Sequence, residues 1–225
     1  MKTTGIQSDP GTRSGPRSGP RSGPRPLRQA QADATRSLIV AAAGQLFTER
    51  GYVGTSIAAI AREAGVAVQT IYNTVGNKAA VLSAILDAAA SGPNAPIPVP
   101  EFMKERTDHA SDFEAVADVL AEWFVEVHDR TAPVFSMIRQ AAAVDGDAAE
   151  LERARAAQRL RHYELAAAAI RARGGLSSGM TDPEAAAVIL AIGHPEVYRT
   201  LVHGRGWTTA AYRKWVRIGL TSALA

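Results

Sequence analysis

Apolar residues recur at helical spacing along most of this chain, beginning in its N-terminal third. The first group would fall on one face of a helix and comprises Leu38, Ile39, Ala42, Leu46 and Phe47. Arg50-Gly51 follows, with glycine at the position where a left-handed C-cap would end that helix. The pattern therefore predicts a helix that ends at Arg50.

Three shorter helical segments come next, separated by glycine turns. Thr55 can cap the first segment, which Gly65 ends, the second runs from Ala67 to Thr74, and Asn77 can cap the third. Their inward-facing residues would be Ile57, Ile60, Ala61, Ala64, Ile71, Val75, Val81, Leu82 and Ile85. A short helix, a glycine turn and a second short helix are typical of the helix-turn-helix motif.

The outward face of the segment from Ala67 to Thr74 is unusual for a surface helix. It carries Val68, Gln69, Asn73 and Thr74, where Lys and Glu are more common. Amide and hydroxyl groups can form hydrogen bonds with base edges in a major groove. The pattern favours a DNA-reading helix, and a plain three-helix core with a polar face is the alternative.

A second helical region follows Ser91–Pro100, a stretch with four prolines that we interpret as a linker. One amphipathic helix is predicted by Phe113, Val116, Leu120, Phe124 and Val127. Pro133 suits the first turn of the next helix, and a long alanine-rich helix is expected from Asp147 to about Arg173.

The last third of the chain has clear helix boundaries. Thr181-Asp182-Pro183-Glu184 combines a cap, a proline at the first helical position and an acid at the positive helix end. Gly193-His194-Pro195 should break or bend this helix. The final helix carries an apolar stripe of Tyr212, Trp215, Val216 and Leu220. No alternating pattern of β-strands is present, so the predicted fold class is all-α.

Composition narrows the class of protein. The chain has 225 residues, 46% of them hydrophobic, and no cysteine, which excludes a disulfide framework, a thiolate zinc site and a cysteine nucleophile. The longest dense apolar run, 38–47, is about half of what a membrane span needs. The first ten residues lack a signal-type apolar core. We expect a cytoplasmic protein with no membrane partner.

The net charge of +3 is unevenly distributed. Residues 1–28 carry six Lys and Arg against one Asp, whereas residues 29–90 are balanced. Residues 13–24 repeat Arg-Ser-Gly-Pro three times, a composition that cannot bury enough surface to fold. We therefore expect a disordered basic arm over residues 1–30, a helix-turn-helix domain over 31–90 and a second domain over 101–225.

Residues 36–86 resemble the DNA-binding domain of the TetR family of bacterial transcription regulators. The matching residues run without a gap and comprise Ala42, Leu46-Phe47, Gly51-Tyr52, Thr55-Ser56, Ile60-Ala61, Ala64-Gly65-Val66, Thr70-Ile71-Tyr72, Gly76 and Lys78. Two positions depart from the family's pattern. Ala67 stands where Ser or Thr often caps the recognition helix, and Val75 stands where Phe is usual.

The resemblance implies how DNA is contacted. Gln69, Thr70, Asn73 and Thr74 would face the groove, Tyr72 and Lys78 would contact phosphates, and Thr55 and Ser56 would approach the backbone. With Val68 on the same face, and with Arg17, Arg21 and Arg25 of the arm neutralising phosphates, these residues form the predicted DNA-binding set.

The resemblance also assigns roles to the second domain. A dimer interface is expected over residues 183–223, through Val188, Tyr198, Leu201, Tyr212, Trp215, Val216 and Leu220; the alternative is that these residues fill an intramolecular core. An effector cavity is expected around Trp123, Phe124, His128, Phe135 and Met137, for which a packed core is equally consistent with the pattern.

Catalytic signatures are absent from the sequence. The five histidines are scattered, and neither a Gly-x-Ser-x-Gly elbow nor a phosphate loop is present. We expect no enzymatic activity, no metal and no cofactor. The predicted function is a homodimeric, ligand-responsive repressor of a palindromic DNA operator, released by an unknown small molecule. An architectural DNA-binding protein with little sequence specificity is the alternative.

Overall fold

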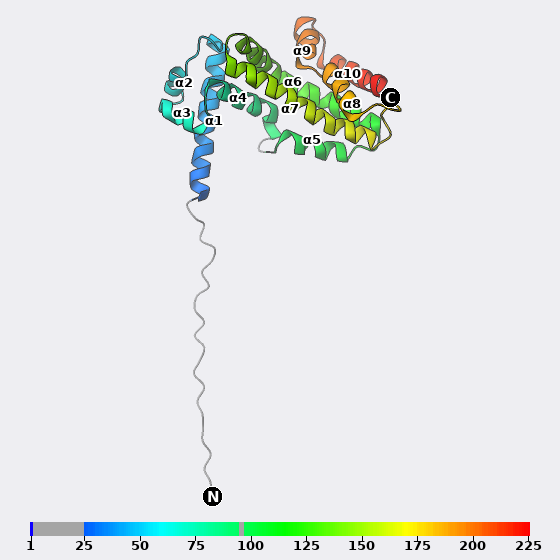
Figure 1. The fold of residues 1–225 in the computed structure, drawn as a ribbon, viewed down its shortest axis with the longest axis horizontal. Helices are drawn as coiled ribbons and strands as arrows, with labels where there is room; N and C mark the ends of the chain where they lie inside the picture. Colours follow the sequence, from blue (N-terminus) through cyan, green and yellow to red (C-terminus); the bar gives the residue numbers. More distant parts are fainter. Residues whose placement is uncertain (2–24, 95–96) are drawn as a thin grey trace.

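The computed structural model describes Met1, residues 25–94 and residues 97–225. Within these ranges the chain forms helices joined by turns and contains no strand, which confirms the all-α class. Four helices gather at the N-terminal end of the molecule, and a longer helical bundle extends from them (Figure 1).

The N-terminal unit consists of α1 (Arg25–Arg50), α2 (Ile57–Glu63), α3 (Val68–Thr74) and α4 (Lys78–Ser91). Gly51, with a φ of 71°, ends α1 as predicted. Asn77 caps α4 as predicted, because its side-chain oxygen accepts a hydrogen bond from the backbone N–H of Ala80. Ala67 stands at the N-cap of α3 and forms no side-chain capping bond.

The cap of α2 differs from the prediction. Ser56, not Thr55, accepts the hydrogen bond from the backbone N–H of Ala59. Thr55 is buried, and its hydroxyl contacts the carbonyl oxygens of Leu46 at 3.1 Å and Gly51 at 2.9 Å. Thr55 therefore fixes the turn after α1, and Ser56 caps the start of α2.

The first helix is longer than predicted. It begins at Arg25, so residues 25–30, which we assigned to the disordered arm, are helical. Arg17 and Arg21 of the predicted arm lie outside the described residues.

The second unit contains α5 (Val99–Asp108), α6 (Phe113–Ala142), α7 (Gly146–Arg171), α8 (Asp182–Ile192), α9 (Pro195–Tyr198) and α10 (Thr209–Leu224), with a short 3-10 turn at Gly92–Asn94 and a π-helical turn at Arg199–Gly204. The long helices α6 and α7 run side by side, α8 packs on α7, and α10 packs on α6 (Figure 1).

Two elements of this unit correct the sequence analysis. Pro133 does not start a new helix but lies within α6. It lies on the exposed side with Asp129, whose carbonyl loses its helical partner, so water can satisfy that carbonyl. The helix α5 was not predicted, and it begins inside the stretch that we interpreted as a linker.

The apolar core of the N-terminal unit extends onto the second unit. Leu46, Phe47, Ile60, Ile71 and Leu82 form its buried centre together with Val134, Ile138 and Ala141 of α6 and Ala148 of α7. Helices α1 to α4 therefore do not enclose their own core, and α6 closes it.

The turn between α6 and α7 adds polar contacts between the two units. The Tyr52 hydroxyl donates to the Asp145 carboxylate at 2.9 Å, and the Asn77 amide donates to Asp147 at 2.8 Å. Asp145 also caps α7, accepting from the backbone N–H groups of residues 147 and 148. The hydrogen bond from Tyr52 holds the pKa of Asp145 below its usual value.

The core of the second unit contains a buried histidine. His128 Nε2 donates to the carbonyl oxygen of Gly193 at 2.8 Å, and its ring stacks on Phe124 with 5.5 Å between centroids. A Cβ at Gly193 would lie 2.2 Å from the Phe124 ring, so only glycine permits this approach of the α8–α9 break to α6.

Replacing Asp145 by alanine should lower the free energy of unfolding by about 2 kcal/mol, because the change removes an N-cap and leaves the buried Tyr52 hydroxyl without its acceptor. Urea denaturation measures this loss. The control is Glu150→Ala, which removes only an exposed pair with Arg153 and should cost at most about 0.5 kcal/mol. Equal losses in the two variants would contradict the role of Asp145.

His128 should make stability fall as the pH drops. Burial lowers its pKa in the folded chain from 6.5 to about 4, because the protonated ring loses hydration. Between these values the unfolded chain binds a proton that the folded chain does not. The contribution of His128 to the free energy of unfolding is therefore complete above pH 6.5. It falls by about 3 kcal/mol in total as the pH drops towards about 4.

The variant His128→Gln isolates this contribution, since glutamine can still donate to Gly193 but does not titrate. Urea denaturation at about pH 7 and about pH 4.5 should show a smaller stability difference in this variant than in the wild type. His109→Gln, at an exposed position, should keep the wild-type difference. An unchanged difference in His128→Gln would show that another group titrates.

Candidate DNA-binding surface and effector cavity

The outward surface of α3 is built on one buried anchor. Ile71 lies fully inside the N-terminal core, so the side chains on the opposite side of this two-turn helix face away from the protein. Gln69, Tyr72 and Asn73 are exposed, as is Val68, whereas Thr70 and Thr74 are partly buried. Five of these six side chains are polar, and none is charged.

The two amides of α3 are paired with each other. Gln69 Nε2 donates to Asn73 Oδ1 at 2.9 Å, across one helical turn. This bond does not use the amide oxygen of Gln69 or the amide nitrogen of Asn73, and both side chains are exposed. An oxygen acceptor beside an NH₂ donor complements the N6 and N7 edge of adenine in a major groove.

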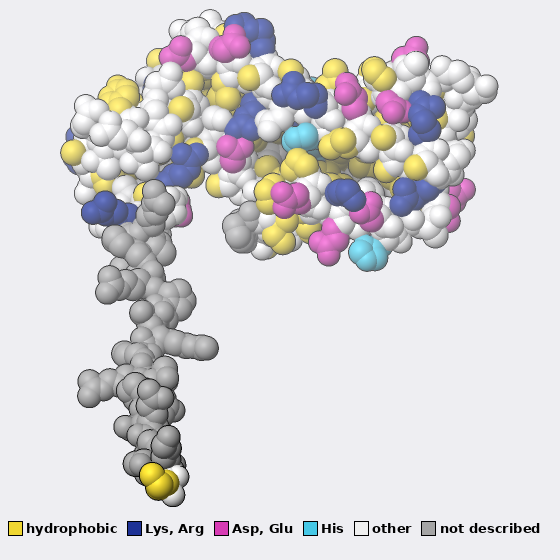
Figure 2. Space-filling model, turned by 60° about the horizontal axis from the view of Figure 1, so that its bottom comes forward, with side chains coloured by type: hydrophobic (Ala, Val, Ile, Leu, Met, Phe, Trp, Pro, Cys, Tyr) yellow, Lys and Arg dark blue, Asp and Glu magenta, His cyan; other side chains and the backbone are white. Residues whose placement is uncertain are grey.

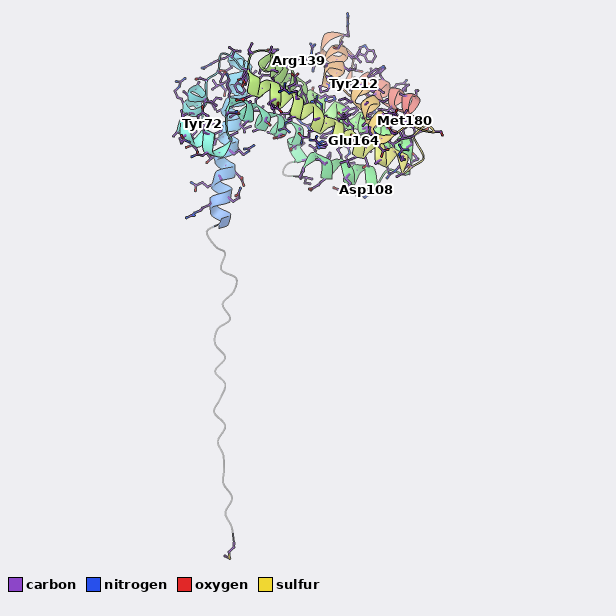
Figure 3. All side chains as sticks on the ribbon, in the orientation of Figure 1. Tyr72, Asp108, Arg139, Glu164, Met180 and Tyr212 are labelled. Carbon is purple, nitrogen blue, oxygen red and sulfur yellow. The ribbon has the colours of Figure 1, made fainter. Side chains whose placement is uncertain are left out.

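The predicted phosphate contacts differ in their surroundings. Tyr72 is 49% exposed and lies at the outer surface of the N-terminal unit (Figure 3). Lys78 is half-buried with its Nζ 4.0 Å from the centroid of the Tyr52 ring, and burial lowers its pKa. Ser56 is exposed. Thr55 must be removed from the predicted DNA contacts, because it is 1% exposed and its hydroxyl is directed into the turn.

A cavity of about 860 Å³ lies between α4, α5, α6 and α7. Figure 2 shows hydrophobic side chains around a hollow on this face of the molecule. Of the five predicted lining residues, Trp123, His128 and Phe135 border the cavity. Trp123 and Phe135 belong to a stripe of α6 that continues through Val127 and Thr131 at spacings of four residues, and His128 lies beside this stripe.

Phe124 and Met137 were wrongly predicted to line the cavity. Phe124 is fully buried on another face of α6, where it packs against His128 and Gly193. Met137 faces the core of the N-terminal unit. Both errors follow from helix geometry, since neighbouring residues on a helix point about 100° apart.

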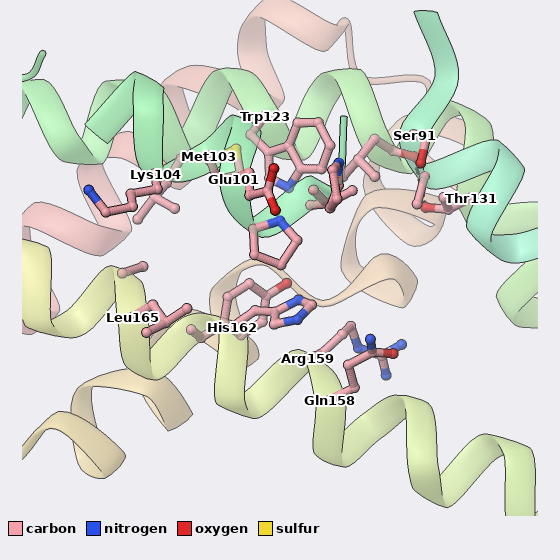
Figure 4. A pocket seen from close by; sticks show the side chains of 18 of the residues that line it. Ser91, Glu101, Met103, Lys104, Trp123, Thr131, Gln158, Arg159, His162 and Leu165 are labelled. Atoms are coloured by element: carbon pink, nitrogen blue, oxygen red, sulfur yellow. Dashed lines mark hydrogen bonds between the residues drawn. The ribbon is translucent and has the colours of Figure 1, made fainter. Parts of the chain in front are cut away.

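The sequence analysis missed the polar wall of the cavity, which α7 supplies through Arg155, Gln158, Arg159, His162 and Tyr163 (Figure 4). Their spacing of three and four residues places them on one helix face. This periodicity of large polar side chains in an alanine-rich helix was the available signal. Arg155 has protein partners, with an ion pair of 2.7 Å to Asp87 and a hydrogen bond of 2.7 Å to Gln158.

Most of the predicted dimer residues are buried within the chain. Tyr198, Tyr212, Val216 and Leu220 are each 0% exposed and form the core between α6 and α10. For these four the intramolecular alternative is correct. Val188 and Leu201 are partly buried, and Trp215 is 37% exposed.

A different stripe of α10 faces outwards. It consists of Ala211, Trp215, Ile218 and Ser222, at spacings of four, three and four residues. Beside it, Arg213 pairs with Glu122 and Arg217 pairs with Asp118 of α6, and the exposed Lys214 lies one turn before Ile218. The four residues of the outward stripe are uncharged, and Lys214 borders them.

Two further features of the described residues bear on function. No helix in residues 25–94 or 97–225 combines the length and apolar character needed to cross a membrane. The same residues bring no three His, Asp or Glu side chains together in a group that could hold a metal ion.

Similar folds occur in solved structures of regulators. One is NalD, the secondary repressor of the MexAB-OprM multidrug efflux pump in Pseudomonas aeruginosa, with 22% identity and a TM-score of 0.65 over 86% of this chain and 98% of that chain. Another is the transcriptional regulator FadR from Bacillus subtilis in complex with stearoyl-CoA, with 20% identity and a TM-score of 0.64 over 84% and 99%. No curated protein sequence matches the chain.

The sequence of the N-terminal unit gives the family. Residues 39–90 match the family described as bacterial regulatory proteins, tetR family. This range contains the buried half of α1, the reading helices α2 and α3, and nearly all of α4. The sequence match therefore places residues 39–90 in the DNA-binding unit of the tetR family, and the described chain as a whole has a fold similar to that of these solved regulators.

Proposed function

We propose that this protein is a ligand-responsive transcriptional repressor that binds a palindromic DNA operator as a homodimer and releases it when a small molecule enters the cavity. The observation that carries the proposal is the uncharged polar surface of α3, where the paired amides of Gln69 and Asn73 lie beside the exposed ring of Tyr72. Such a surface suits base edges better than phosphates.

A two-fold operator requires two reading units in fixed register. The outward stripe of α10, formed by Ala211, Trp215, Ile218 and Ser222, supports dimerisation because it exposes large apolar side chains without charge. The partly exposed Val188 lies on α8, which packs against α10, so both helices can contribute to one interface. A two-fold interface buries the same surface on both subunits.

The cavity supports a small-molecule effector. Its volume of about 860 Å³ lies in the range of drug-sized sites, and its wall combines apolar side chains with a few polar groups. The related FadR holds stearoyl-CoA, and the related NalD is a repressor. Helix α6 borders the cavity and also closes the core of the reading unit through Val134 and Ile138, so a ligand that favours one position of α6 would change the reading unit.

Binding to DNA is tested with a duplex site selected from a random library. Gln69→Ala should reduce the preference for one base pair, because it should remove about 1–3 kcal/mol of binding free energy at the preferred base. Tyr72→Ala should instead weaken binding to all sequences by a similar factor, because a phosphate contact carries no sequence information. Fluorescence anisotropy with the selected site and single-base variants measures both effects.

The matched control is Gln140→Ala, on the exposed side of α6. It should leave affinity and base preference unchanged. Equal affinity of the wild type for the selected site and for competitor DNA would instead support an architectural protein, whose binding the basic arm would dominate. Unchanged affinity in Tyr72→Ala would contradict the docking proposed for α3.

The dimer is tested by placing charge on the outward stripe of α10. The double variant Trp215→Glu with Ile218→Glu should convert a dimer into a monomer, since each interface would then contain four carboxylates without partners. Light scattering coupled to size-exclusion chromatography measures the mass. Val144→Glu, at another exposed apolar position, should remain dimeric. A dimer that survives the double variant would place the interface elsewhere.

A further inference from the structure

The cavity has two chemically different sides. Helix α6 contributes the aromatic Trp123 and the apolar Val127, and α5 contributes Met103 beside the charged Glu101 and Lys104 (Figure 4). Helix α7 contributes Arg159, His162 and Tyr163 on the facing side. A molecule that fills the cavity therefore meets an apolar surface at one side and hydrogen-bond donors at the other.

Arg159 is the cation of this wall that other described residues do not satisfy. Its Nε and Nη1 atoms are shielded from solvent, and among the described residues neither has a hydrogen-bond partner. The guanidinium lies 4.3 Å from the centroid of the Phe135 ring, a contact that stabilises the charge in part. Arg155, one turn earlier, contrasts with it because it pairs with Asp87.

The acids near the cavity do not replace that partner. Asp87 is engaged by Arg155, and Asp108 is engaged by Lys104 on α5. Glu101 lines the cavity from α5 but is exposed. Glu152 acts on Arg159 through its charge without forming an ion pair with it. Burial lowers the pKa of Arg159, which is the expected sign for a cation that has lost water without gaining an anion.

We propose that the cavity binds an amphipathic monocarboxylate, whose carboxylate group is held by Arg159 and whose apolar body packs against Trp123 and Val127. This inference rests on the effector role proposed for the cavity. A guanidinium can bind both oxygens of a carboxylate through two of its nitrogens, and at Arg159 a small side-chain movement would bring the shielded nitrogens to the ligand. A phosphate monoester, with nearly two negative charges, would need more than this one unpaired cation.

Calorimetric titration of the full chain tests the proposal with decanoate and naphthaleneacetate, each compared with its primary amide. The amides keep the shape of the acids and lose the charge. At least one acid should bind about ten- to a hundredfold more tightly than its amide, the range expected for a charge-assisted hydrogen bond in a shielded site. Failure of both acids to bind, or equal affinity for acid and amide, would overturn the proposal.

Variants locate the carboxylate. Arg159→Gln should abolish the preference for acid over amide, and Arg159→Lys should retain part of it. Arg161→Gln, which makes the same charge change on the exposed side of α7, should keep the full preference. An acid preference that persists in Arg159→Gln would assign the anion to another residue and overturn the proposal.

A second measurement separates ligand binding from a structural role of Arg159. The melting temperature of Arg159→Met without ligand should equal or exceed that of the wild type, because a shielded cation without a full partner is removed. The increase in melting temperature on adding the acid should disappear in the same variant. A large fall in melting temperature without ligand would show that Arg159 supports the fold and would overturn its assignment as a ligand anchor.

Failure of this inference can be told apart from failure of the proposed function. Arg159→Gln should bind the selected DNA site as the wild type does, since Arg159 lies in the second unit. If the acid binds through Arg159 but does not release DNA, the cavity assignment stands and the effector role fails. If no acid binds while Gln69→Ala relaxes base choice, the proposed DNA-binding function stands and the carboxylate inference fails.

Discussion

The packing of α6 against the N-terminal unit is the contact on which the rest of the structure depends. Helices α2 and α3 have seven residues each, too few to be stable alone in water. They persist because Ile60 and Ile71 are buried in a core that Val134 and Ile138 of α6 complete. Ala67 adds nothing to this, since it cannot cap α3. The orientation of the outward surface of α3 is therefore set by tertiary packing and not by local helix stability.

The same helix connects the reading surface to the cavity. Within α6, Trp123, Val127, Thr131 and Phe135 face the cavity. Val134 and Ile138, one and three positions from Phe135, face the N-terminal core. The turn after α6 adds two hydrogen bonds, from Tyr52 to Asp145 and from Asn77 to Asp147. A displacement of α6 or α7 cannot leave the reading unit unaffected, because packed interfaces move between discrete arrangements and do not stretch.

Local signals in the sequence predicted most of the fold, and they failed where two faces of a helix compete. The caps at Asn77 and Thr181 and the break at Gly193-His194-Pro195 are encoded within a few residues, and all three are confirmed. On α10, by contrast, Val216 and Trp215 are both apolar, and only the neighbouring helices decide that Val216 is buried. Thr55 was misplaced for a different reason, since its burial depends on how the turn after α1 folds back on that helix.

The cavity shows a further limit of sequence analysis, because its most informative residue has an ordinary sequence context. An arginine in an alanine-rich helix is usually a solvated residue, and the spacing of large polar residues around Arg159 indicates a polar helix face without showing that this one side chain is shielded. Arg159 is distinguished only by its surroundings in the fold, because Phe135 of α6 lies over the guanidinium and no acid of the described residues pairs with it. Keeping such a cation costs stability. A bound anion would restore the missing interactions. Arg159 would then destabilise the chain with an empty cavity and stabilise the chain with an occupied one. A ligand-driven switch requires such a difference between its two states.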